Sequence, residues 1–149
     1  MLALAFTLTL LLAGACGKPA PSAGHPHPME FAAVLEANDP NWATTPEVEL
    51  HGEQLRLGPV RSFAVASYSL TRDELGHAAI AFDLAESEKA AFTSWTGSLV
   101  DRRLAFFVDG TLTYAPTIKS ALPGRGIAKV GLPDEECQKL LQHLQGSDS

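Results

Sequence analysis

The stretch LAFFVDGTLTYAPTIKS, residues 104–120, constrains the fold more than any other part of the chain. Its first five residues are apolar and predict a central strand that is covered on both faces. Asp109 and Gly110 supply the positive backbone dihedrals that a tight hairpin needs, and the five residues after Gly110 predict the returning strand. Pro116 has no amide hydrogen to give to a sheet ladder, so pairing must end or bulge there. The chain is therefore expected to contain a buried hairpin within a sheet.

Further strand patterns lie at residues 29–35, 48–50, 54–57, 60–69, 76–84 and 127–130. In the strand at 60–69, strict alternation places Phe63 and Val65 on one face and Tyr68 on the other. In the strand at 76–84, the even-numbered residues from Ala78 to Leu84 share one apolar face. Short charged or polar connections join these strands, which favours antiparallel neighbours.

Two segments have the period of a helix. In residues 86–99, Phe92, Trp95 and Leu99 recur at i, i+3 and i+7, and Trp95 is predicted to lie in the core. A final helix follows Pro133, with Cys137, Leu140, Leu141 and Leu144 along one side. The predicted fold is α+β, a mainly antiparallel sheet with two helices packed on one face. Its order over residues 60–146 is β-β-α-β-β-β-α.

The pattern of the N-terminal residues predicts an export signal. Residues 2–13 form an apolar run that is too short to span a bilayer and fits a secretory signal. Small residues at 13–15 stand directly before Cys16, an order that resembles the cleavage box of bacterial lipoproteins, in which the cysteine thiol receives the lipid. We therefore expect residues 1–15 to be a lipoprotein signal peptide and Cys16 to be lipidated. The alternatives are a plain secretory signal cleaved near Ala15 and a retained anchor.

The remaining chain divides by composition. Residues 16–28 are rich in Pro, Gly and Ser and are expected to form a lipid-anchored tether. Residues 29–59 would be an N-terminal strand and loop extension, 60–146 the main domain, and 147–149 a disordered tail. The expected location is the cell envelope, with the domain in the periplasm. Whether the inner or the outer membrane holds the lipid stays open.

Charge and cysteine content exclude several function classes. The net charge is −6 and the pI is about 5.3, which argues against a nucleic-acid partner. The two cysteines form no CxxC motif, so a zinc ribbon or a thioredoxin-like site has no support. If Cys16 is acylated, Cys137 has no partner, and we expect it to be buried and unreactive.

The motifs together resemble one known module, the head subdomain of the first periplasmic domain (P1) of the SecD and SecDF protein-export subunits. The family shows a Phe and a Thr four residues apart on its first helix, a Leu-Ala strand ending in Asp-Gly, an Ala-Pro-x-Ile segment, and a final helix with spaced leucines. The matching residues are Phe92, Thr96, Leu104, Ala105, Val108, Asp109, Gly110, Ala115, Pro116, Ile118, Gly124, Ile127, Glu136, Leu140, Leu144 and Gly146. Cys137 stands where the family has alanine.

The resemblance covers residues 60–146 and implies a role as well as a fold. SecD subunits carry transmembrane helices that are tied to proton-driven transport, and this sequence shows none of them. What the resemblance implies is the role of the head alone: contact with an unfolded or emerging polypeptide outside the membrane, or with an envelope membrane protein such as the export machinery.

No residue pattern predicts catalysis. The sequence has no GxSxG, no phosphate-binding glycine loop and no evident Ser-His-Asp order. His25 and His27 flank Pro26 and are interpreted as incidental residues of the tether, while His51 and His77 are too far apart in sequence to predict a metal pair. We therefore predict no catalytic, cofactor-binding or metal site. One residue, Trp42, is predicted to contact a partner because it follows a turn-rich loop.

These observations predict a non-enzymatic cell-envelope lipoprotein with a SecDF P1 head-like domain. It would bind polypeptide or an envelope partner and act as an accessory to protein export, attached to the membrane through its N-terminal lipid. No small-molecule substrate and no cofactor are expected. The alternative is a structural or regulatory interaction domain of the envelope that has no export role.

Overall fold

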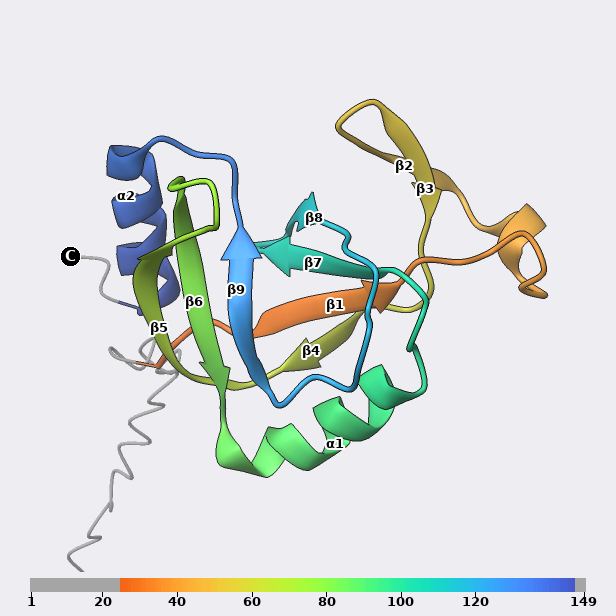
Figure 1. The fold of residues 1–149 in the computed structure, drawn as a ribbon, viewed down its shortest axis with the longest axis horizontal. Coiled ribbons are helices and arrows are strands. Elements are labelled where there is room, and N and C mark those ends of the chain that lie inside the picture. Colours follow the sequence, from red (N-terminus) through yellow and green to blue (C-terminus); the bar gives the residue numbers. More distant parts are fainter. Residues whose placement is uncertain (1–24, 147–149) are drawn as a thin grey trace, which may run out of the picture.

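The structure is a computed structural model and describes residues 25–146 (Figure 1). The predicted signal peptide, the lipidation site Cys16, most of the tether and the tail lie outside these residues. Neither α-helix within residues 25–146 has the length and apolar content that crossing a membrane requires.

The strands form three antiparallel sheets. The four-stranded sheet has the order β4 (Arg61–Phe63), β1 (Met29–Ala33), β7 (Leu104–Val108) and β8 (Thr111–Tyr114). The three-stranded sheet has the order β5 (Val65–Arg72), β6 (Ala78–Leu84) and β9 (Arg125–Lys129). A separate hairpin of β2 (Glu47–Leu50) and β3 (Glu53–Arg56) projects from the body of the molecule (Figure 1).

Two α-helices complete the fold, α1 (Glu86–Gly97) and α2 (Asp134–Leu144), with a short 3-10 helix η1 (Trp42–Thr44) before β2. From β5 onward the order is β-β-α-β-β-β-α, as predicted, but the single strand predicted at 60–69 divides into β4 and the start of β5, which belong to different sheets. The α+β class with mainly antiparallel strands and two helices is confirmed. The structure adds that the main strands divide between two sheets, which the sequence patterns did not separate.

The hairpin of β7 and β8 forms at the predicted place. Asp109 and Gly110 have φ angles of 50° and 74°, the left-handed pair that a tight hairpin turn needs. Regular pairing ends before Pro116, which lacks an amide hydrogen but whose carbonyl accepts a hydrogen bond from the Leu104 amide at 2.9 Å. The proline thus ends the strand without detaching the chain that follows it.

The core lies where the two larger sheets and both helices meet. Phe31 of β1 is fully buried, and its ring lies within about 6 Å of the rings of Phe63, Phe82, Phe92 and Phe106, centroid to centroid. These rings come from both larger sheets and from α1. One hydrophobic core therefore serves residues on both sides of the division between the sheets.

A β-bulge changes the side on which Tyr68 lies. The pairing of β5 with β6 shifts between Val65 and Ser67, so an extra residue is inserted there. Val65 and Tyr68 are both buried as a result, whereas strict alternation had placed them on opposite faces. The predicted orientation of Tyr68 is thus wrong, because a bulge breaks the two-residue period.

The helices bury their apolar sides in this shared core. Phe92 of α1 packs on Phe31 and Phe63 of the four-stranded sheet, with centroids 4.9 and 5.1 Å apart. The other helix, α2, packs against β5 and β6 and buries Cys137 and Leu144 completely. The prediction that Cys137 is buried is confirmed, and burial raises the pKa of its thiol. The thiol is therefore protonated and inaccessible near neutral pH.

Candidate functional site

Within residues 25–146, one long edge of β9 has no partner strand. The Leu84 amide donates to the Gly124 carbonyl at 2.8 Å, which fixes the hydrogen-bonding phase between β6 and β9. Because alternate residues of an antiparallel strand bond the same neighbour, Gly126 and Ala128 also face β6. The backbone groups of Arg125, Ile127 and Lys129 then point away from the sheet.

These outward groups have no backbone partner among residues 25–146. Ile127, a large apolar residue at the middle of β9, is 44% exposed. An edge strand with unpaired amide and carbonyl groups is a template for pairing with another extended chain. This edge is the strongest candidate for a binding site in the described part of the molecule.

A groove runs along the inner side of β9. Residues 116–122 form its opposite wall, the side chains of Phe82 and Phe106 form its floor, and its volume is about 330 Å³. Figure 1 shows this segment descending beside β9 before the chain turns back into it. Gly126 leaves room for the floor, because a Cβ there would stand 3.2 Å from the Phe82 ring. The groove is apolar in its depth and open to solvent.

A second hollow lies on the outer face of the same strand. It has a volume of about 290 Å³ and is lined by Ser67, Ser69, Ala81 and Ile127, among others. Small side chains on β5 and β6 leave this face shallow and open. The unpaired edge of β9 is therefore flanked by a hollow on each side.

The far wall of the groove is fixed by α1. The hydroxyl of Thr93 donates to the Leu122 carbonyl at 2.7 Å, and the Leu122 amide donates to the hydroxyl of Thr96 at 2.9 Å. Thr96 is fully buried and itself donates to the Phe92 carbonyl at 2.9 Å. Both backbone groups of Leu122 are thus satisfied by one helix, which keeps the groove from collapsing.

An ion pair and a cation–π contact hold one end of β9 in place. Lys129 pairs with Glu74 and lies over the ring of Tyr114 at 5.3 Å, so the end of β9 is attached to the β5–β6 turn and to β8. The hydrogen bond between the two lowers the pKa of the Glu74 carboxyl and raises the pKa of the Lys129 ammonium. β9 is consequently fixed at its end while its middle stays open.

Trp42, the predicted contact residue, lies in a different place. It is half-buried in η1, and the guanidinium of Arg56 lies 4.1 Å above its ring while donating to its carbonyl at 2.6 Å. It borders a polar hollow of about 420 Å³ together with Glu53 and Arg103. Partner contact through Trp42 stays a prediction. Trp95 is half-buried at the border of the core, stacked on Phe63 at 5.8 Å.

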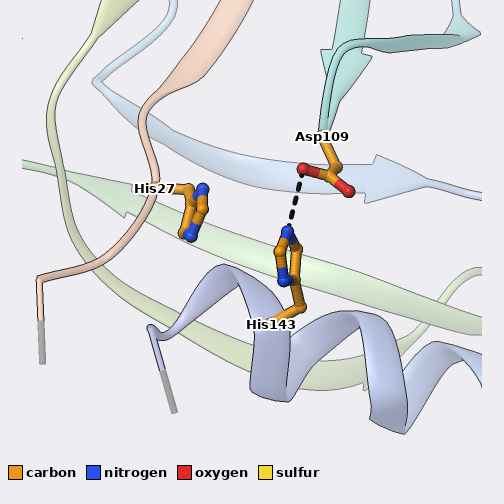
Figure 2. A group of neighbouring side chains, drawn as sticks. All are labelled: His27, Asp109 and His143. Atoms are coloured by element: carbon orange, nitrogen blue, oxygen red, sulfur yellow. Dashed lines mark hydrogen bonds and ion pairs between the residues drawn. The ribbon is translucent and has the colours of Figure 1, made fainter. Parts of the chain in front are cut away.

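The histidines are distributed in a way that the sequence did not reveal. His51 and His77, interpreted as unrelated, line one hollow of about 430 Å³. His27, interpreted as an incidental residue of the tether, lies beside Asp109 and His143 (Figure 2). These three residues form the group within residues 25–146 whose donor atoms are close enough to share a metal ion. No local spacing signals it, since each residue comes from a different element.

Comparison with known proteins supports the fold. No protein-family profile matches the sequence, and no curated protein matches it. Among solved structures, one described as "Structure and function of a membrane component SecDF that enhances protein export" matches 83% of this chain and 64% of its own, at 19% identity and a TM-score of 0.62. A second, the crystal structure of SecDF in its super-membrane-facing form, also matches 83% of this chain, at 19% identity and a TM-score of 0.60.

The chain spans less than two thirds of either SecDF structure, 64% of one and 19% of the other. At 19% identity this likeness shows the fold alone. The resemblance to a SecD-type periplasmic domain, predicted from the sequence motifs, is therefore confirmed as a likeness of fold.

Proposed function

We propose that this chain binds an extended polypeptide segment along the open edge of β9 and serves protein export as a non-enzymatic accessory. The fold likeness supports an export-related role, because the SecDF structure that it matches is described as a membrane component that enhances protein export. Fold alone does not carry function, so the proposal depends on the site.

The observation that carries the proposal is the unpaired edge of β9 between its two hollows. A peptide that pairs with β9 would satisfy the outward backbone groups of Arg125 and Ile127. Successive side chains of a strand point to opposite faces, so the peptide would place one set in the inner groove and the other in the outer hollow. Main-chain hydrogen bonds would supply affinity with little sequence preference, which suits an unfolded client.

The predicted N-terminus gives this activity a location. With Cys16 lipidated and residues 17–28 as a tether, the domain would work at the periplasmic surface of a cell-envelope membrane. An emerging polypeptide is still extended there, and its strands are not yet paired. A lipid anchor would therefore keep the β9 edge where such clients appear.

The proposal is tested with a substitution that removes one outward amide. Ile127→Pro deletes an N–H that points away from β6, so the sheet should keep its internal ladder. Binding of a short fluorescent peptide with alternating apolar and small residues, measured by anisotropy, should weaken about tenfold or more. Ile127→Val keeps the amide and the branched side chain and should bind like the parent.

A second control separates the edge of β9 from edges in general. By the same alternation, the Leu70 amide points outward from β5, on the opposite edge of this sheet. Leu70→Pro should leave peptide binding unchanged if the variant folds by circular dichroism. Equal binding by parent and Ile127→Pro would overturn the proposal, as would equal losses at both edges. Unaltered secretion in a deletion strain would remove the export role while leaving peptide binding in place.

A further inference from the structure

Three donor side chains from distant parts of the chain converge at the C-terminal end of α2. They are His27, which precedes β1, Asp109 in the β7–β8 turn, and His143 in the last turn of α2 (Figure 2). Each offers one ligand atom, and these atoms all lie within 4.8 Å of one another. His143 Nε2 and Asp109 Oδ1 are already 3.1 Å apart.

The backbone of each residue is held in place independently. The His27 amide donates to the Leu144 carbonyl at 2.8 Å, and its carbonyl accepts from the Tyr68 hydroxyl at 2.6 Å. Asp109 occupies a left-handed position of a tight turn, and His143 belongs to a regular helix. The three donors are thus presented by an ordered backbone, which is part of the preorganisation that a metal site requires.

We propose that His27, Asp109 and His143 bind a transition-metal ion, with Zn²⁺ as the best match. Two imidazoles and one carboxylate are a nitrogen-oxygen set that suits zinc, with bonds of about 2.0–2.2 Å. Tetrahedral ligands at that distance stand about 3.4 Å apart, close to the observed 3.1 Å between His143 and Asp109. His27 must move closer to complete the set, and a water or an external ligand would take the fourth position.

The surroundings favour a cation at this place. The C-terminal end of a helix carries the negative end of its dipole, and His143 lies in the last turn of α2.

The site is separate from β9 and goes beyond peptide binding. Its ligands join the segment that leads out of the predicted tether to α2 and to the tip of the β7–β8 hairpin. An ion there would tighten the attachment of residues 25–28 to the domain. Metal binding would thus be linked to how firmly the anchored N-terminus is held.

Isothermal titration of the full chain with Zn²⁺ tests the site, in mild detergent and with an affinity tag that contains no histidine. After treatment with EDTA, we expect one ion per chain with a Kd in the micromolar range or below, and no binding of Mg²⁺. His143→Ala and Asp109→Asn should each weaken binding by about tenfold or more, since even residues outside the ligand set commonly have that effect. His51→Ala and His77→Ala remove histidines outside the site and should bind like the parent.

Imidazole NMR keeps the test decisive if a variant fails to fold. In the unaltered chain, Zn²⁺ should shift the ring nitrogens of His27 and His143 and leave those of His51 and His77 in place. Absence of zinc binding, binding that survives His143→Ala in a folded protein, or shifts confined to His51 and His77 would each overturn the proposal.

Discussion

The two larger sheets differ in the side chains that their strands carry. The four-stranded sheet supplies Phe31, Phe63 and Phe106 to the aromatic core. The three-stranded sheet has small residues such as Ser67, Ser69 and Ala81 on its outer face, and β9 forms an open edge. Large rings bury much apolar area at little entropic cost, whereas small residues leave a backbone accessible. Both sheets contribute to the core, but the first supplies more of its aromatic rings, and the proposed binding edge belongs to the second.

This difference predicts the largest effect at Phe31. Phe31→Ala removes a fully buried ring that contacts four others and should lower the free energy of unfolding by about 3–5 kcal/mol. Ile127→Ala in β9 truncates a residue that is 44% exposed and should change stability by less than about 1 kcal/mol.

Urea denaturation of both variants measures this contrast. Ile127→Ala should keep a stability close to the parent while its peptide binding falls, because the exposed side chain borders both hollows. Similar losses of stability in the two variants would show that the exposed middle of β9 stabilises the fold as much as the aromatic core does, and the comparison would fail.

Thr96 offers a smaller effect that connects the two regions. It lies on α1, which packs on the four-stranded sheet, and its hydroxyl accepts a hydrogen bond from the Leu122 amide in the groove wall. Thr96→Val keeps the shape and leaves that amide unsatisfied, so stability should fall by about 1–3 kcal/mol. Peptide affinity should fall as well, since the wall opposite β9 loosens.

Thr93→Val is the matched control on the same helix. Thr93 donates to the Leu122 carbonyl but is only half-buried, so water can replace the lost bond. We expect its cost to be below that of Thr96→Val in the same denaturation series. A larger loss of stability in Thr93→Val than in Thr96→Val would show that Thr93 is the residue that holds the groove wall.

Sequence patterns were sufficient where the signal is local. The Asp109-Gly110 turn, the end of pairing before Pro116 and the order of elements from β5 onward all follow from neighbouring residues and are confirmed. In the sequence, Phe92 and Thr96 are identified only by their match to a motif of the SecD and SecDF family. The structure supplies its physical reason, since one residue fills the core and the other holds the groove wall.

Features that depend on distant partners were not predictable. The bulge before Tyr68 breaks a period that strict alternation assumes, and the partition of strands into two sheets depends on pairing, which no periodicity records. Nor does any spacing bring His27 to Asp109 and His143. The open edge of β9 was not predictable either, because it depends on β6 being the single partner of β9 in the sheet.

The smallest predicted effect is a loss of stability in acid that begins in the three-stranded sheet. Asp73 accepts the amides of His77 and Leu75, each at 2.9 Å, and the first of these bonds contributes most to lowering its pKa. Arg72 likewise lowers the pKa of Asp134, which ties the β5–β6 turn to α2. A carboxyl whose pKa is lower in the folded state binds fewer protons there than when unfolded. Its contribution to stability is present above the unfolded pKa of about 4 and is lost as the pH falls through the lower pKa of the folded state.

Hydrogen exchange followed from pH 7 down to about 3 localises this loss. The amides of Leu75 and His77 should lose protection before those of β1 and β7, because the aromatic core has no carboxylate in it. Asp73→Asn keeps a side-chain oxygen that accepts these amides but cannot titrate, so its midpoint in urea should depend less on pH than that of the parent. Stability that rises on acidification, or simultaneous loss of protection in both sheets, would contradict this difference between the sheets. A step that begins at the β5–β6 turn would instead place the weakest part of the fold in the sheet that carries the open edge, since local opening there leaves the four-stranded sheet and its rings intact.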